Sequence, residues 1–181
     1  MHALAARRGE LGIDALNEAL RAALNPDGLP VRGGRLRIGD KLMMTGRNLH
    51  DLGLMNGALL RLLDEVASGR GEDDAALILG AEDAVFRLPL EESDRLRLAY
   101  ACSVHRGQGI ELPIAVLVAH PGAGAFFLRR EMLYTAITRA QIATVIVGMR
   151  TVVLRAARTP DTGRRHSRLA ERLLSRCPQD F

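Results

Sequence analysis

The sequence predicts a protein of the α/β class. The apolar run from Ile114 to Ala119 has a proline on either side, as is typical of a short strand buried in a parallel sheet. A helical pattern over Phe127–Ala140 follows, and after it comes the β-branched run Thr144–Gly148. Strands that alternate with a helix in this way predict a parallel sheet with helices packed against it.

The chain opens with a pattern that predicts an amphipathic helix from Leu11 to Leu24. Apolar residues recur there at spacings of three and four, and two acidic residues lie near the helix start, where the helix dipole favours negative charge. The turn-forming run Asn25-Pro26-Asp27-Gly28 is expected to end this helix. A glycine- and arginine-rich connector then leads into a second unit.

This second unit is expected to consist of short strands. Apolar residues alternate from Leu36 to Met44 around a Gly-Asp turn, and Ala75–Leu79 with Val85–Leu90 predicts a hairpin. The stretch Ala58–Val66 is ambiguous from its residues alone, because its apolar spacing also fits a helix. After the unit, alternation from Leu96 to Cys102 predicts one further strand.

Composition favours an anionic partner. The 181 residues are enough for one good core or for one domain with a smaller inserted one. The formal net charge is +4, and Lys41 is the sole lysine among 25 basic residues. Aromatic residues make up 3% and tryptophan is absent, so we expect contacts to phosphates rather than stacking on bases.

Cysteine usage and hydropathy exclude several other classes. Cys102 and Cys177 lack metal-ligand spacing with nearby histidines, so both are expected to be free thiols and no metal site is predicted. The chain shows no leader-like segment and no apolar run of membrane length. We therefore expect a cytoplasmic protein that does not act at a membrane.

Two stretches carry groups suited to binding a polyanion. The first, Leu98–Pro113, reads LAYACSVHRGQGIELP and places histidine, arginine and glutamine donors beside two glycines. The second, Arg129–Arg139, reads RREMLYTAITR and leads into the apolar run ATVIVG. Taken alone, the first stretch is read more readily as an ordinary glycine-containing loop with one surface histidine.

Together these stretches resemble motifs V and VI of superfamily 1 DNA helicases of the RecD/TraA type, which carry a UvrD-like C-terminal domain. The segment GDKLMMTGRN, with MNG after it, resembles the small β insertion of the same family. The resemblance implies a second RecA-like motor domain, residues 1–34 and 93–181, interrupted by an SH3-like β unit, residues 35–92. It also favours a strand over a helix at 58–66.

The resemblance implies a nucleotide-binding role for three residues. Arg139 closes ITR and corresponds to the arginine finger that reaches the γ-phosphate of ATP. Glu111 matches the glutamate that bonds the ribose, and Gln108 would link the nucleotide side to the DNA side. Their residue types also permit a helix-capping arginine, a solvated carboxylate and a buried loop amide, respectively.

Ser103, His105 and Arg106 match the residues that meet the DNA backbone in the family, although a single histidine is more often structural. The sequence departs from the usual pattern at four positions. Arg106 replaces a lysine and keeps its charge. Gly107 and Ile110 remove hydroxyl groups, and Gln141 removes a positive charge, so activity that has been tuned or has decayed is an open alternative.

The phosphate cradle and the metal site of a motor are not found in this sequence. It contains neither GxxxxGK[ST] nor an apolar strand ending in a DE pair. We therefore expect no ATP hydrolysis by the chain alone, and ATP with Mg²⁺ only when a Walker-bearing N-terminal domain is supplied. The expected function is the C-terminal motor half of a DNA helicase that grips single-stranded DNA. The alternatives are a stand-alone nucleic-acid-binding or interaction module and an inactive truncated product.

Overall fold

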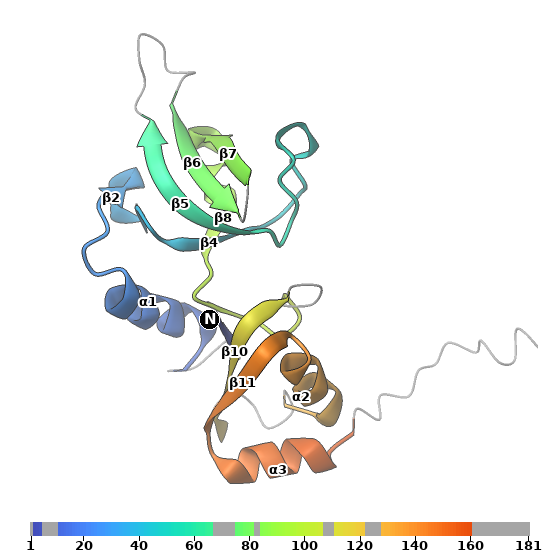
Figure 1. The fold of residues 1–181 in the computed structure, drawn as a ribbon. Helices are drawn as coiled ribbons and strands as arrows, with labels where there is room; N and C mark the ends of the chain where they lie inside the picture. The colour runs from blue at the N-terminus through green and yellow to red at the C-terminus, as the bar shows by residue number, and fades with distance from the viewer. Residues whose placement is uncertain are drawn as a thin grey trace, which may run out of the picture.

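Two β-sheets, one above the other in Figure 1, organise the chain in the computed structural model. The structure describes residues 2–4, 11–66, 75–81, 84–106, 111–121 and 128–160, and of residues 2–4 only the backbone. A four-stranded sheet has the order β11-β10-β1-β9, and a five-stranded sheet has the order β7-β6-β5-β4-β8. A two-stranded ribbon, β2 (Pro30–Val31) with β3 (Leu36–Arg37), lies beside them.

The four-stranded sheet is parallel throughout. Its strands are β1 (His2–Leu4), β9 (Ala101–Cys102), β10 (Leu112–Ala119) and β11 (Ala140–Gly148). Helices α2 (Arg130–Ile137) and α3 (Arg150–Arg158) pack against β10, where Ala115 and Leu117 are buried with Leu133 and Ala156. Because β10 pairs with a parallel strand on each side, the expected buried parallel strand and the α/β class are confirmed.

The five-stranded sheet is antiparallel and forms a unit with its own core. Its strands are β4 (Lys41–Met44), β5 (Leu59–Val66), β6 (Ala76–Ala81), β7 (Ala84–Pro89) and β8 (Leu96–Leu98). In β5, buried Leu60 and Leu62 alternate with exposed Arg61 and Leu63, which confirms the strand. The predicted hairpin is confirmed as β6 and β7.

The expected single strand from Leu96 to Cys102 is wrong. The first part, β8, pairs with β4 in the antiparallel sheet, whereas β9 pairs with β1 in the parallel sheet. Every residue from Ala99 to Val104 is buried, because this stretch passes from one core directly into the other. The antiparallel sheet therefore extends to Leu98, past the boundary at residue 92 expected for the β unit.

The remaining helices also differ in part from expectation. Helix α1 (Ile13–Leu24) follows the predicted pattern and is capped by Asn25, as the turn residues indicated. Helix α2 ends at Ile137, three residues short of the predicted end at Ala140, and β11 takes up the chain from Ala140, earlier than the expected Thr144. Neither β1 nor α3 was predicted, since both are short elements. No described helix combines the length and apolar character needed to cross a membrane.

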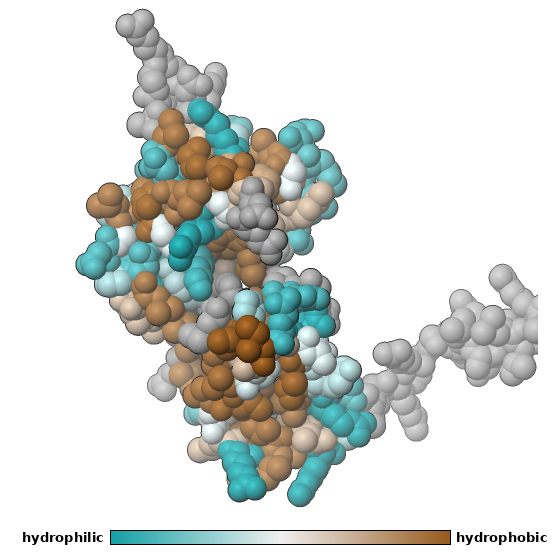
Figure 2. All heavy atoms as spheres, in the orientation of Figure 1, coloured by the Kyte–Doolittle hydropathy of each residue, from teal (hydrophilic) through white to brown (hydrophobic). Residues whose placement is uncertain are grey.

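Strand β11 lies at the edge of the parallel sheet and leaves apolar side chains exposed. Val145 and Val147 pair in register with Val116 and Val118 of β10, so these four side chains share one face of the sheet. Val145 is 47% exposed and Val147 is 53% exposed. Figure 2 shows a broad hydrophobic surface in the lower half of the molecule, where β10 and β11 lie. Exposed apolar surfaces of this kind commonly mark a site of association.

Candidate nucleic-acid interface

A cleft of about 650 Å³ lies between the antiparallel β unit and the parallel sheet. It is lined by residues of α1, β3, β4, β8 and β9 and of the turn after β9. Ser103 and Arg106, two of the three residues predicted to contact DNA, line this cleft together with Arg35 and Arg97 of the β unit. The two halves of the chain therefore contribute cationic side chains to one concave surface.

The turn after β9 holds the predicted DNA-contacting residues. Ser103 is 7% exposed, and its Oγ accepts a hydrogen bond from the backbone N–H of Arg106 at 3.3 Å. That bond fixes the turn and leaves the Arg106 side chain exposed at the cleft. His105 is exposed but is not among the residues lining the cleft. Gln108 lies outside the described residues.

Arg35 and Arg97 were missed by sequence reasoning. The Arg35 guanidinium donates to the Ser93 carbonyl at 2.8 Å and pairs with Asp94 at 3.0 Å. Arg97 donates to the Asp94 carbonyl at 2.9 Å. The same short segment after β7 therefore orients both guanidinium groups. It does so through two backbone carbonyls and the exposed carboxylate of Asp94. In an arginine-rich sequence nothing distinguishes these two, since only the fold brings them to the cleft.

Asn17 attaches α1 to the strand that leads into this site. The amide is 4% exposed, donates to the Ala101 carbonyl at 3.0 Å and accepts from the Ala101 N–H at 2.9 Å. It thereby satisfies the backbone of β9 as a neighbouring strand would. A polar residue among the apolar positions of an amphipathic helix was the sequence signal that could have identified it.

Cys102 lies beside the cleft but has the properties of a core residue. Burial raises the pKa of its thiol from the ordinary value of 9.0 to about 11, against a smaller opposing effect of Arg106. The thiol is therefore protonated at neutral pH and a poor nucleophile or metal ligand. Within the described part of the chain, no group of three or more histidine, cysteine, aspartate or glutamate side chains could hold a metal ion.

A second group of predicted residues meets where β10 and β11 begin. The Leu112 N–H donates to the Arg139 carbonyl at 2.8 Å, which places Glu111 and Arg139 on adjacent segments. The Gln141 side chain donates to Glu111 Oε2 at 2.7 Å. Arg139 is half-buried, and its Nε donates to the Thr135 carbonyl of α2 at 3.3 Å. The structure thus brings two of the three predicted nucleotide-binding residues together.

This arrangement lies within a segment that matches a known family. Residues 98–147, which hold Ser103, Arg106, Glu111 and Arg139, match the UvrD-like helicase C-terminal domain. Over this segment the chain is similar to a helicase C-terminal domain. The resemblance drawn from motifs V and VI is therefore confirmed.

Two relatives show how much of a helicase this domain represents. The ATP-dependent RecD2 DNA helicase of Deinococcus radiodurans is 35% identical over 137 residues, which cover 75% of this chain and 18% of that protein. The crystal structure of the Pif1 helicase from Candida albicans has a TM-score of 0.60 at 16% identity, covering 96% of this chain and 49% of that one. The RecA-like fold is thereby confirmed. The chain spans less than half of the length of each of these proteins.

Proposed function

We propose that the helicase C-terminal domain binds single-stranded DNA in the cleft between its two sheets, as the C-terminal part of an ATP-dependent motor. The observation that carries this proposal is the convergence of Arg35, Arg97 and Arg106 on one cleft beside Ser103. Guanidinium groups bind phosphate oxygens strongly and in defined geometry. The RecD2 relative is an ATP-dependent DNA helicase, which agrees with this proposal.

The chemistry of the cleft favours the sugar–phosphate backbone over the bases. Half of the described residues that line the cleft are apolar, and none of them is aromatic. The polar ones are the three arginines, two carboxylates on α1, the Asn17 amide and the Ser103 hydroxyl. Base stacking on aromatic rings is the usual route to tight single-strand binding. We therefore expect moderate affinity, little sequence preference and a strong dependence on salt.

The nucleotide role of Arg139, Glu111 and Gln108 is part of the same proposal. Arg139 would stabilise charge on the transferred phosphate, and Glu111 would accept a hydrogen bond from a ribose hydroxyl. Gln141 already donates a hydrogen bond to Glu111. In the bound state, the ribose hydroxyl would take the place of the Gln141 amide as the donor to this carboxylate. Among the described residues, the Arg139 side chain makes one long hydrogen bond, to α2, so its other N–H groups would bind the anion.

The described residues could form only part of an ATP-binding site. Lys41, the sole lysine, lies within β4, and burial followed by the nearby Arg61 lowers its pKa. Such a position in a sheet is unlike the loop that cradles phosphates at a helix N-terminus. ATP with Mg²⁺ would therefore be held by a Walker-bearing domain, to which this chain adds Arg139 and Glu111.

A Walker-bearing N-terminal helicase domain is accordingly the proposed protein partner. The RecD2 relative is matched over only 18% of its length, so the bulk of such a motor lies outside the matched region. The exposed valine face of β11 is consistent with a further covering layer, because parallel sheets are normally covered on both faces.

Fluorescence anisotropy of a labelled oligothymidylate tests the DNA-binding proposal. We expect Arg97→Ala and Arg106→Ala each to weaken binding and to reduce the dependence of log Kd on log salt by about one. Arg87→Ala, which removes the same charge from β7 outside the cleft, is the matched control. Equal losses for all three variants would indicate general attraction to the basic surface, and an unchanged Arg106→Ala would exclude the cleft.

A further inference from the structure

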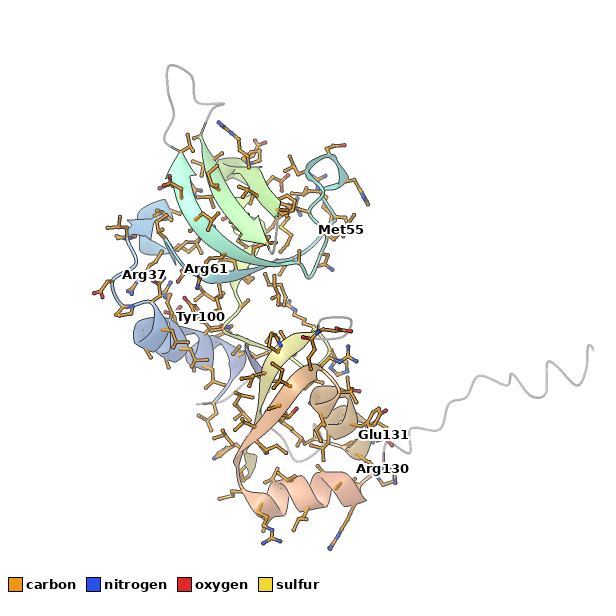
Figure 3. The ribbon with its side chains drawn as sticks, in the orientation of Figure 1. Arg37, Met55, Arg61, Tyr100, Arg130 and Glu131 are labelled. Carbon is orange, nitrogen blue, oxygen red and sulfur yellow. The ribbon has the colours of Figure 1, made fainter. Side chains whose placement is uncertain are left out.

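Asp40 lies fully buried at the junction of the two sheets, outside both groups of predicted site residues. Its exposed fraction is 0%. Oδ1 accepts hydrogen bonds from the Tyr100 hydroxyl at 3.0 Å and from Asn25 Nδ2 at 2.9 Å, while Oδ2 accepts from the Arg37 N–H at 2.8 Å. Figure 3 shows Arg37 and Tyr100 at this junction, between α1 and the β unit. One carboxylate therefore receives three donors.

The three donors come from three separate segments. Asn25 ends α1, Arg37 belongs to β3, and Tyr100 lies between β8 and β9. These are the places where the chain enters the β unit and leaves it again. A buried carboxylate is strongly destabilising when any partner is lost, so the network favours one relative placement of α1, the β unit and the strand toward the cleft.

The cleft walls are attached to this junction from both sides. Arg21 lies with Nη1 3.9 Å from Asp40 Oδ2, and the same nitrogen donates to the Arg35 carbonyl at 3.0 Å. Arg35 thereby has its backbone held close to the carboxylate while its guanidinium lines the cleft. On the other side, Tyr100 precedes Ser103 in one continuously buried stretch. The spacing between Arg35 and Arg106 thus depends on groups that meet at Asp40.

We propose that Asp40 is a positioning residue that sets the spacing of the arginines across the cleft and so determines the affinity for single-stranded DNA. This inference rests on the proposed DNA-binding function. The Asp40 network then has a role beyond folding. Phosphates along a strand are regularly spaced, so guanidinium groups held at a matching spacing can bind several of them at once. A loosened junction would bind fewer phosphates at once, even in a folded protein.

Two substitutions of different severity test the proposal. Tyr100→Phe removes one donor and little volume, and Asp40→Asn removes the charge while keeping the side-chain shape. Leu88→Ala, which truncates a fully buried residue in the core of the β unit, is the control for lost stability without a change at the junction. All three are compared with the wild type at a temperature where each is folded.

Distances between the two units are measured by double electron–electron resonance. Spin labels are placed at Val85→Cys of β7 and Ile142→Cys of β11, both highly exposed positions, with Cys177→Ser in the background. We expect the distance distribution to broaden in Tyr100→Phe and more in Asp40→Asn, but to remain narrow in Leu88→Ala. Equal widths in all four proteins would overturn the proposal.

Binding of the labelled oligothymidylate supplies the functional readout. We expect Kd to rise roughly tenfold in Asp40→Asn, the factor that corresponds to losing about one hydrogen bond, with a smaller rise in Tyr100→Phe and little change in Leu88→Ala. Comparable losses in Leu88→Ala would reduce Asp40 to a structural residue and overturn the proposal. If the wild type binds no DNA, the proposed function fails and the role in affinity fails with it. Broadened distances would then still assign the spacing of the cleft to Asp40.

Discussion

The side-chain amide of Asn17 binds both the N–H and the carbonyl of Ala101, at 2.9 Å and 3.0 Å. A helix residue thus takes the place of a strand partner for β9, the last strand at its edge of the parallel sheet. This pairing holds α1 where it can line the cleft. It also gives hydrogen-bond partners to the buried N–H and C=O of Ala101, which lies two residues before Ser103.

Replacement of Asn17 is expected to be costly. Asn17→Ala leaves the buried N–H and C=O of Ala101 without partners, which should lower the free energy of unfolding by about 2–3 kcal/mol. Urea denaturation followed by circular dichroism measures this change. Glu18→Ala, which removes an exposed helix ion pair with Arg21, should cost well under 1 kcal/mol. Equal midpoints for Asn17→Ala and the wild type would contradict the structural role of the pairing.

Arg139→Ala is expected to leave folding nearly intact. Arg139 is half-buried, and within the described part of the chain its side chain makes one hydrogen bond, of 3.3 Å to a helix carbonyl, so its loss should cost less than about 1 kcal/mol. When a Walker-bearing first domain is supplied, ATP turnover should be measurable with the wild-type chain and lost with Arg139→Ala. A marked fall in the denaturation midpoint of the isolated chain would instead identify Arg139 as a structural cap.

The purified chain should show no ATPase activity, with or without single-stranded DNA. The reason is chemical: the sequence contains no GxxxxGK[ST] loop to cradle phosphates, and its Asp64-Glu65 pair lies within the antiparallel strand β5 rather than at the end of a parallel strand. A coupled assay of phosphate release measures this directly. Turnover that disappears with Arg139→Ala, in a preparation otherwise free of contaminating ATPase, would show that the prediction is wrong.

Alkaline pH should destabilise the fold through Cys102. Its pKa is raised by burial from 9.0 to about 11, so the folded state retains a proton that the unfolded state releases. The associated stability is fully present below pH 9 and is lost as pH rises toward 11, on the order of 2 kcal/mol. Tyr100, whose pKa is raised by burial and then by Asp40, acts in the same direction.

Urea midpoints of the wild type and Cys102→Ala, each measured at pH 8 and at pH 10.5, separate the cysteine from other alkaline effects. We expect the midpoint of the wild type to fall further between the two values than that of the variant. Parallel falls in both proteins would show that ionisation of the Cys102 thiol is not coupled to unfolding.

Much of the fold could be predicted because its signals are local. The helix to Leu24 repeats apolar residues every third or fourth position, the β6–β7 hairpin alternates them, and β10 is a continuous apolar run between prolines. The motif residues Ser103, Glu111 and Arg139 were also identified from sequence, since they lie in two short recognisable stretches. The structure places Ser103 at the cleft and the other two side by side.

The sequence by itself determined the α/β class, the resemblance to a helicase C-terminal domain and the candidate residues of motifs V and VI, because each depends on neighbours within one segment. Only the tertiary structure decided that the chain changes sheets between Leu98 and Ala101, that the Tyr100 hydroxyl donates to buried Asp40, and that Arg35 and Arg97 line one cleft with Arg106. These features join residues far apart in sequence. An alternating apolar pattern looks the same whether a strand stays in one sheet or passes between two. The sheet that each segment joins is set by the backbone and side-chain partners that the assembled fold provides.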